Sequence, residues 1–367
     1  MSKGNPPAVP TLVVTADDRS GAMETAALCA DAGMCTWVRS WDGDPVPDRG
    51  ARCVVTDLRS RHVTAAEAAE RMGAVIAQGV RPHAHKIDST LRGNWATEVG
   101  VLAASGGVLL VASYPSAGRT CVGGEVRVYG VPLVESEFGA DLRSAARSSR
   151  PVDVLAALGM GDVVGATDAD AVARWAEAGA SGVCVADAAS DDDDVRSVVA
   201  SVAGRHDIVV VGSALAVATA VALRNTSSTP PSSPRPSLPE GPVLVVCGSR
   251  HAASRAQAHA GATISGVTVL FPQDEVGSDA EVVALELAVR AHDHLHAEGA
   301  ELVVLLGGDT ADAFLGERPV RVVASLAAGL ALGEVLIDGR TVPILTKPGG
   351  FGQDQLLVEL LRARGQR

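Results

Sequence analysis

One stretch of the chain, Lys86 to Asn94, is more polar than a segment that only supports a core would be. It holds a lysine, an arginine, an acid, two hydroxyls and an amide around one glycine, with only two apolar residues. Lysine and arginine bind carboxylates or phosphates, whereas Asp, Ser and Asn bind hydroxyls. The run therefore predicts a site for a small hydroxylated anion. The alternative is a polar turn in which Asp88 or Ser89 begins a helix.

Two adjacent acids, Asp17 and Asp18, follow the first apolar run of the chain. In open α/β sheets, ligands bind beyond the carboxyl ends of the strands, so these acids could bind hydroxyls, hold a metal or act as a base. Asp18 or Ser20 could also cap the next helix. Another turn places Arg119 beside glycines, where its fork would suit a carboxylate or phosphate. Taken alone, that turn is equally typical of an exposed loop.

Three glycine-rich segments follow apolar runs in the last third of the chain. They are Gly248–Arg250, Gly307–Thr310 and Lys347–Gly352, after the runs Val243–Cys247, Leu302–Leu306 and Val342–Thr346. Glycines let backbone N–H groups approach phosphate oxygens, and a following helix N-terminus favours negative charge. None of the segments has the P-loop or the dinucleotide-binding pattern. If the three loops meet at one edge of one sheet, they predict a nucleotide site.

The elements that must position these residues alternate between strand and helix patterns. Buried strands are predicted at Thr11–Thr15, Cys53–Thr56, Val108–Ala112, Gly182–Ala186 and Ile208–Val211, with helices at Gly21–Gly33 and about Thr64–Gln78. This alternation indicates an α/β fold with mainly parallel or mixed sheets. The Pro- and Ser-rich residues 226–242 are interpreted as a linker between two domains, 1–225 and 243–367. A long surface loop within one domain is the alternative.

Composition limits the classes of function. A content of 47% hydrophobic residues is enough for a large core, and a net charge of −12 argues against a nucleic-acid or anionic-membrane binder. No apolar run is long enough to predict a membrane helix, and no signal peptide is recognisable. Six scattered cysteines indicate buried, reduced thiols and not a disulfide framework or a zinc site. We therefore expect a cytoplasmic protein, and its assembly as a homodimer is left open.

Together the polar segments resemble the four-carbon acid sugar kinase family, long known as a domain of unknown function. The run from residue 86 to 94 matches the pattern Lys-x-Asp-Ser-Thr-x-Arg-Gly-Asn in full, and residues 118–120 and 130–136 match two further elements. The first family pattern, Ala-Asp-Asp-Leu-Thr-Gly-Ala, is kept except at Arg19 and Ser20. Both glycine motifs at residues 307–310 and 347–352 are present.

Two further departures are visible. His251 stands where family members often have a serine, and residues 328–331 replace a Pro-Gly-Val-Pro element. The family architecture implies an acid-sugar-binding N-terminal domain and a nucleotide-binding C-terminal domain, with the active site in the cleft between them.

The resemblance implies an ATP-dependent kinase of threonate, erythronate or 3-oxo-tetronate that uses Mg²⁺, with no protein metal ligands assigned. A catalytically silent relative that only senses these ligands is the alternative. Substrate would contact Asp17, Asp18, Lys86, Asp88, Ser89, Arg92, Asn94 and Arg119, and ATP would contact Ser249, His251, Gly307, Gly308, Asp309, Thr310, Gly349 and Gly350. Asp88, Asp18, Lys86 and Arg92 are the expected catalytic group. Either acid could be the base, with a slight preference for Asp88, and the cations would hold the substrate carboxylate.

Overall fold

The computed structural model describes residues 11–48, 50–78, 81–141, 143–225, 236–273, 279–349 and 352–364. In the N-terminal part, up to residue 225, the strands are β1 Leu12–Ala16, β2 Thr36–Ser40, β3 Cys53–Asp57, β4 Ala84–Lys86, β5 Gly107–Val111, β6 Arg119–Val122, β7 Glu125–Val128, β8 Val131–Pro132, β9 Val163–Ala166, β10 Val183–Ala186 and β11 Ile208–Gly212. The α-helices are α1 Arg19–Asp31, α2 Ala65–Ala77, α3 Trp95–Ala103, α4 Pro151–Ala157, α5 Ala169–Glu177, α6 Asp192–Ala200 and α7 Ala214–Arg224. Single 3₁₀ turns are η1 Pro115–Ala117, η2 Leu133–Glu135 and η3 Glu137–Ala140.

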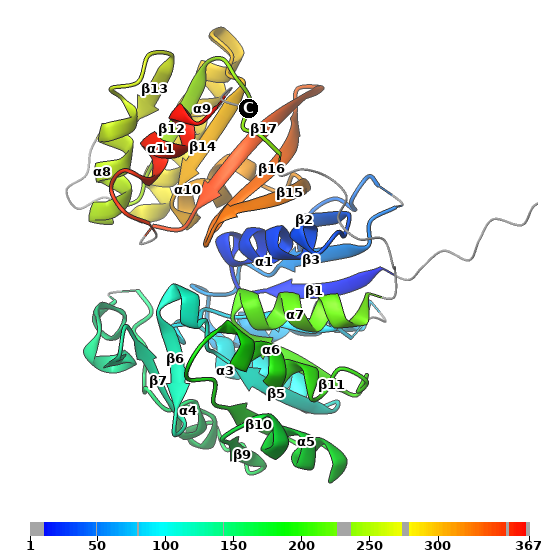
Figure 1. Cartoon of the computed structure of the whole chain (residues 1–367). Helices are drawn as coiled ribbons and strands as arrows, with labels where there is room; N and C mark the ends of the chain where they lie inside the picture. The colour runs from blue at the N-terminus through cyan, green and yellow to red at the C-terminus, as the bar shows by residue number, and fades with distance from the viewer. Residues whose placement is uncertain are drawn as a thin grey trace, which may run out of the picture.

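The C-terminal part, from residue 236, is smaller. Its strands are β12 Val243–Cys247, β13 Val267–Leu270, β14 Leu302–Leu306, β15 Val320–Ala327, β16 Leu330–Ile337 and β17 Arg340–Lys347. Its helices are α8 Ala252–Gly261, α9 Ala280–Ala297, α10 Gly308–Leu315 and α11 Leu356–Arg362. Figure 1 shows this part stacked above the N-terminal part.

The strands of both parts form one 14-stranded sheet in the order β13-β12-β14-β17-β16-β15-β2-β3-β1-β4-β11-β5-β10-β9. All neighbours from β2 to β9 in this order are parallel. In the C-terminal part, β13, β12, β14 and β17 are parallel, and β15, β16 and β17 form an antiparallel meander. The two parts are joined by antiparallel pairing of β15 with β2. Strands β6, β7 and β8 form a separate small sheet.

Helices cover both faces of the sheet because its strands are buried on both faces. Five-residue strands such as β5, β12 and β14 are buried at every position, which requires a helical layer on each side. Helices α1, α7, α6 and α5 pack side by side over one core, and α2 and α3 cover another. In the C-terminal part, α9 packs with α10 and α8 packs with α11.

Helix α1 lies at the junction of the two parts, below β15 (Figure 1). It contacts β3 and α7 of its own part, and β15, β16 and α10 of the C-terminal part. Its N-terminus directly follows Asp17 and Asp18. The helix that begins at the two predicted acids therefore contacts both parts of the molecule.

The predicted fold class, α/β with mainly parallel or mixed sheets, is confirmed, although the sheets of the two parts join edge to edge. Of the predicted linker, residues 226–235 lie outside the described residues, so the boundaries at 225 and 243 stay predictions. All six cysteines are free, and five are buried, in line with the prediction of reduced thiols. Within the described ranges, no helix combines the length and apolar character that crossing a membrane requires.

Candidate active site

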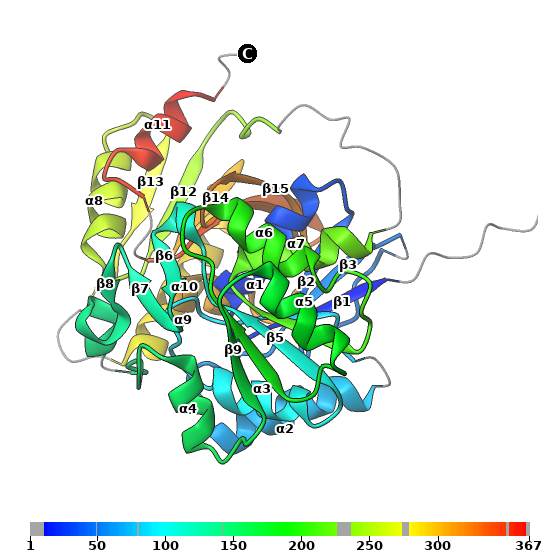
Figure 2. The ribbon, with the colours of Figure 1, turned by 60° about the horizontal axis from the view of Figure 1, so that its bottom comes forward.

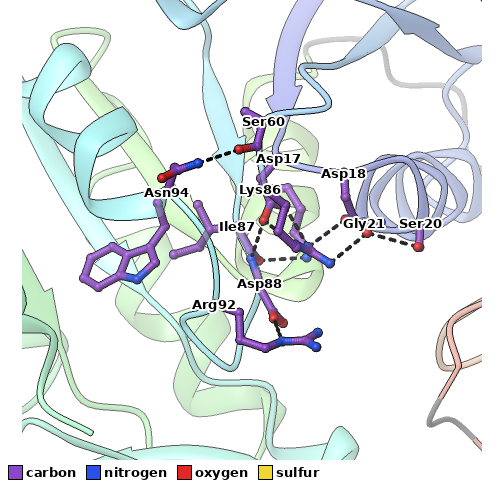
Figure 3. Close-up of polar contacts among 12 residues, drawn as sticks. Asp17, Asp18, Ser20, Gly21, Ser60, Lys86, Ile87, Asp88, Arg92 and Asn94 are labelled. Carbon is purple, nitrogen blue, oxygen red and sulfur yellow. Dashed lines mark hydrogen bonds and ion pairs between the residues drawn. The ribbon is translucent and has the colours of Figure 1, made fainter. Parts of the chain in front are cut away.

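The site begins where β1 ends, at Asp17 and Asp18 (Figure 3). Asp18 is extended, with φ −146°, and caps α1 because its Oδ1 accepts a hydrogen bond from the backbone N–H of Gly21 at 2.9 Å. Its other oxygen accepts from the hydroxyl of Ser20 at 3.0 Å. Asp17 is fully buried, and its backbone N–H donates to the carbonyl of Lys86 at the end of the neighbouring strand β4. The capping role and a role in the site are thus compatible at Asp18.

An arginine that the sequence patterns did not single out, Arg61, holds both acids. Its Nε and Nη2 donate to the two oxygens of Asp17 at 2.8 and 2.9 Å, and its Nη1 and Nη2 donate to those of Asp18 at 2.8 and 2.7 Å. Burial raises the pKa of Asp17 in spite of this guanidinium. Burial acts the same way on Asp18, but Arg61 and Lys86 outweigh it and lower the pKa. The two adjacent acids therefore differ in acidity, and Asp18 is the stronger acid of the two.

The predicted run from Lys86 to Asn94 folds against these acids. Lys86 is buried, and its Nζ donates to the backbone carbonyl of the next residue at 2.7 Å. The N–H of Asp88 donates to Asp17 at 3.3 Å, and the Asp88 carboxylate accepts from the hydroxyl of Thr90 at 2.8 Å. The same carboxylate accepts from Nε of Arg92 (Figure 3). Burial alone would raise the pKa of Asp88, but the surrounding cations hold it well below its usual range. Asp88 is therefore an anion already engaged by its neighbours.

The last two residues of the run support the loop that carries Arg61. The side-chain amide of Asn94 donates to the carbonyls of Ser60 and Val63, both at 2.8 Å. Gly93 has φ +79°, and a Cβ atom there would lie 2.9 Å from the carbonyl oxygen of Arg61. Only glycine combines that backbone angle with so close an approach. Part of the motif thus fixes the position of the arginine.

The other predicted substrate residues border the same region. Ser89 is half-buried next to Asp88. Arg119 is buried and donates to the carbonyl of Ala117. Its charge and that of Lys86 both act on Glu24 of α1, where they oppose the rise in pKa that burial causes. Glu24, like Arg61, is a charged residue of this region that the sequence patterns did not indicate.

The three glycine-rich loops meet, as predicted, at one edge of the C-terminal part, because β12, β14 and β17 are adjacent and parallel. A Cβ atom at Gly349 would lie 2.7 Å from the hydroxyl oxygen of Ser249, and one at Gly307 would lie 3.2 Å from Cβ of Ser249. A Cβ atom at Gly248 would overlap the side chain of Thr310. The predicted Gly350 lies outside the described residues.

A buried lysine shapes the last of these loops. Nζ of Lys347 donates to the hydroxyl of Ser254 at 3.1 Å and to the carbonyl of Pro348 at 3.0 Å. Burial lowers the pKa of Lys347 to about 8. The loop is therefore held by a cation that desolvation has made less basic than an exposed lysine.

The two groups of predicted residues come together at the N-terminus of α10. A Cβ atom at Gly308 would lie 2.7 Å from the hydroxyl oxygen of Ser20 and 3.7 Å from Oδ2 of Asp18. The preceding residue, Gly307, has φ +116° and contributes no side-chain cap. On the same side, Asp309 pairs with Arg143 at 2.9 Å. The uncapped start of a helix thus abuts a carboxylate of the predicted substrate site.

The predicted nucleotide residue His251 also meets the N-terminal part. Its Nε2 lies 3.5 Å from Oε2 of Glu137 in η3. Its backbone N–H donates to the hydroxyl of Ser249 at 3.3 Å. His251 therefore connects a glycine-rich loop to the segment that follows β8.

The other end of α10 is fixed by two arginines of the N-terminal part. Nη2 of Arg19 and Nη2 of Arg59 each donate to the carbonyl of Gly316 at 2.7 Å. Arg59 also pairs with Asp312 at 2.9 Å, and Arg19 pairs with the buried Asp57 at 3.0 Å. Burial raises the pKa of Asp57 to about 7, although Arg19 opposes that shift. Arg19, a departure from the family pattern, is therefore a buried contact between the two parts.

Comparisons with known proteins agree with this architecture. Residues 12–223 match the family described as "Sugar-binding N-terminal domain". A D-threonate kinase from Cupriavidus necator is 32% identical over 366 residues, covering 93% of this chain and 86% of the relative. A D-threonate kinase from Bordetella bronchiseptica is 27% identical over 413 residues, covering 98% of each chain.

A solved structure from Bordetella bronchiseptica, described as a domain of unknown function with bound citrate and as a domain-swapped dimer, is also similar. It is 26% identical, has a TM-score of 0.51, and the match covers 97% of this chain and 99% of that one. The match of the N-terminal part over residues 12–223, together with relatives that align over more than nine-tenths of this chain, establishes the family. The chain belongs to the four-carbon acid sugar kinase family, whose N-terminal part is the sugar-binding domain.

Proposed function

We propose that the protein transfers the γ-phosphoryl group of ATP to a hydroxyl of a four-carbon sugar acid, with D-threonate as the first substrate to test. The observation that carries the proposal is the contact between the start of α10 and the residues that follow β1. The start of α10, at Gly308, abuts Asp18 and Ser20, so an anion bound by that helix would lie next to the acids and cations of β1 and β4. Phosphoryl transfer depends mainly on such alignment and on offsetting charge.

In this proposal the substrate lies against Lys86, Arg92 and Arg119, whose charges would hold its carboxylate. The C-terminal loops bind ATP through their glycine backbones, as phosphates bind at helix N-termini. Relatives named D-threonate kinase, D-erythronate kinase and 3-oxo-tetronate kinase support an acid of this size. The citrate bound in the structure from Bordetella bronchiseptica is likewise a small hydroxylated carboxylate. Because that structure is described as a domain-swapped dimer, a dimer is the assembly to test for this protein.

The geometry favours Asp18 over Asp88 as the acceptor of the substrate proton. The carboxylates of both acids accept hydrogen bonds from neighbouring groups. The preference rests on position, because Asp18 is the acid next to Gly308, where this proposal places the phosphates of ATP. A general base needs hydrogen-bond reach to the reacting hydroxyl before it needs a particular pKa. Asp88 would then keep Arg92 in the orientation that binds the substrate carboxylate.

Magnesium fits this donor set as an ion that arrives with ATP. Within the described ranges, no cluster of three or more His, Cys, Asp or Glu could hold a metal unaided. Mg²⁺ in kinases is commonly held by the substrate phosphates and one or two carboxylates, and here Asp309 would supply one. Bound there, the ion would offset charge on the phosphates.

The test is release of ADP with ATP, Mg²⁺ and separate samples of D- and L-threonate, D- and L-erythronate, 3-oxo-tetronate and glycerate. Turnover confined to one or two four-carbon acids would support the proposal. ATP binding by calorimetry without turnover would instead favour the ligand-sensing alternative. Asp18→Asn and Asp88→Asn are compared on the best substrate. Loss of kcat in Asp18→Asn that greatly exceeds the loss in Asp88→Asn would support Asp18 as the base, and the reverse order would exclude it.

A further inference from the structure

The segment after β8 connects the substrate residues to the nucleotide helix. Asp141 accepts a hydrogen bond from Nη1 of Arg92 at 2.9 Å, and the ring of Phe138 lies 5.2 Å from the Arg92 guanidinium. Two residues beyond Asp141, Nη1 of Arg143 donates to Oδ2 of Asp309 at 2.9 Å. Figure 2 shows the small sheet that carries this segment beside the C-terminal part. One short stretch of chain thus contacts Arg92 on one side and the first turn of α10 on the other.

Arg143 faces the place where an anion is most favoured. Asp309 lies in the first turn of α10, where the partial positive charge of the helix attracts negative groups. The pKa of His62 is lowered by partial burial and then by the charges of Arg143 and Arg61, and Asp309 and Asp18 oppose this. Arg143 pairs with Asp309, Arg61 pairs with Asp18, and a Cβ atom at Gly308 would lie 3.7 Å from Asp18, so these charges meet at the junction between Asp18 and α10.

The backbone near Arg143 is held more firmly than its side chain. Oδ1 of Asp141 accepts from the N–H groups of Arg143 at 2.9 Å and Ser144 at 3.0 Å. The side chains of the pair itself are 42% exposed at Arg143 and 49% at Asp309. Exposed ion pairs of this kind contribute at most about 1 kcal/mol. The guanidinium can therefore leave Asp309 at small cost for a group with more negative charge.

We propose that Arg143 is a further catalytic residue, whose guanidinium passes from Asp309 to the transferred phosphoryl group when ATP is bound at α10. This inference rests on the proposed kinase function. As the substrate oxygen bonds to the γ-phosphorus, the bond from that phosphorus to the β–γ bridging oxygen breaks. The hydroxyl proton goes to a carboxylate, and ADP leaves with the bridging oxygen. Arg143 stays protonated throughout, and its guanidinium offsets the negative charge on the three equatorial oxygens of the transferred phosphoryl group.

Substitutions at this position separate a catalytic role from a purely structural contact between the two parts. We expect Arg143→Ala to lower kcat at least about 100-fold, in the range found when a cation or donor of a charged transition state is removed. Its KM for ATP should change less than about threefold, and its Tm should fall by no more than about 2 °C, because the pair is exposed. The kcat of Arg143→Lys should lie between those of the wild type and Arg143→Ala, since a lysine keeps the positive charge but lacks the forked guanidinium.

Two further measurements complete the test. Free guanidinium ion should restore part of the kcat of Arg143→Ala, which a structural contact would not require. Arg147→Ala is the matched control, because Arg147 is an exposed arginine four residues further on, and its kcat should equal that of the wild type.

Three results would contradict the inference, and they can be told apart. A kcat for Arg143→Ala within about threefold of the wild type would overturn the inference alone and leave the kinase intact. A fall in kcat matched by a large loss of Tm, with no rescue by guanidinium, would also overturn it in favour of a structural contact. A wild-type protein that turns over none of the sugar acids would overturn the proposed function and the inference with it.

Discussion

Substitution of Gly21 by alanine would place a methyl group where the site has no room for one. A Cβ atom there would lie 2.7 Å from Oδ1 of Asp18 and 3.0 Å from Nζ of Lys86. Non-bonded heavy atoms in ordinary contact are about 3.5 Å apart, so the Asp18 oxygen must move by roughly 0.8 Å and the Lys86 nitrogen by roughly 0.5 Å. The substitution therefore tests the positions of the proposed base and of a proposed substrate cation without removing either.

The expected effects on stability nearly cancel. Alanine is favoured over glycine within a helix by about 1 kcal/mol. Displacing the Asp18 carboxylate from the N–H of residue 21 costs about 1 kcal/mol through loss of the helix cap. Catalysis is more sensitive, because a misplacement of about 1 Å can cost about 100-fold in rate. We therefore expect Gly21→Ala to change the free energy of unfolding by less than about 1 kcal/mol and to lower kcat about 10- to 100-fold.

The chain offers a matched control in Gly73, which lies inside α2 with no atom within 4 Å of the position of its Cβ. Gly73→Ala should raise the free energy of unfolding by about 0.5 to 1 kcal/mol and leave kcat unchanged. Urea unfolding and ADP release measure both quantities in each variant. Wild-type kcat in Gly21→Ala would refute the reasoning that the placement of Asp18 and Lys86 determines the rate.

Three further predictions concern buried charges. Arg61→Met should lower the free energy of unfolding by roughly 3 kcal/mol in urea, because Asp17 and Asp18 would lose their shared cation; a loss below about 1 kcal/mol would contradict this. Burial raises the pKa of Asp57 from 3.8 to about 7. Between these pH values the folded state binds more protons than the unfolded state, so the contribution of Asp57 to stability falls as the pH rises from about 4 to 7. Asp57→Asn removes that contribution, so the stability of the wild type relative to this variant should fall across the same interval in urea unfolding; a constant difference would contradict the assignment. The double variant Asp57→Asn with Arg19→Leu should lose less free energy of unfolding than the two single variants lose in sum, by at least about 1 kcal/mol. The reason is that the double variant removes both partners of the ion pair and leaves neither one buried alone.

Much of the sheet could be predicted because its strands are short, apolar and bounded by turns. Val243–Cys247 and Leu302–Leu306 coincide with β12 and β14, in which every residue is buried. The strands that join the two parts carry no such signal. Strand β2, Thr36–Ser40, contains three polar residues in five, and its partner β15 lies almost 300 residues further along the chain. Pairing at that separation depends on the tertiary fold, so the sequence predicted two sheets where the structure has one.

The residues of the candidate site also divide into those that the sequence could predict and those that it could not. The Lys86 to Asn94 run was evident because many polar types are concentrated in it, and the structure places it against Asp17. Arg61 was missed because it belongs to an ordinary-looking turn after β3. A signal was available, since β3 is a neighbour of β1 in the sheet and its end must lie near Asp17 and Asp18. Arg143 had none, because it comes from an irregular segment whose position depends on contacts with the other part.

The two departures from the first family pattern, Arg19 and Ser20, both contact α10. Ser20 packs against Gly308 at the start of the helix, and Arg19 donates to the carbonyl of Gly316 at its end. If the two parts separate, Arg19 loses that bond but keeps Asp57, which belongs to its own part. Arg19 and Arg59 would also lose Asp312, and Arg143 would lose Asp309, but the side chains of both acids are already 36% and 49% exposed. The contact of His251 with Glu137 joins side chains that are 38% and 66% exposed. Separation at these contacts would therefore leave no buried charge without its partner. Under the proposed function, the junction would align ATP with the acids and release product without the large penalty of an unpaired buried ion.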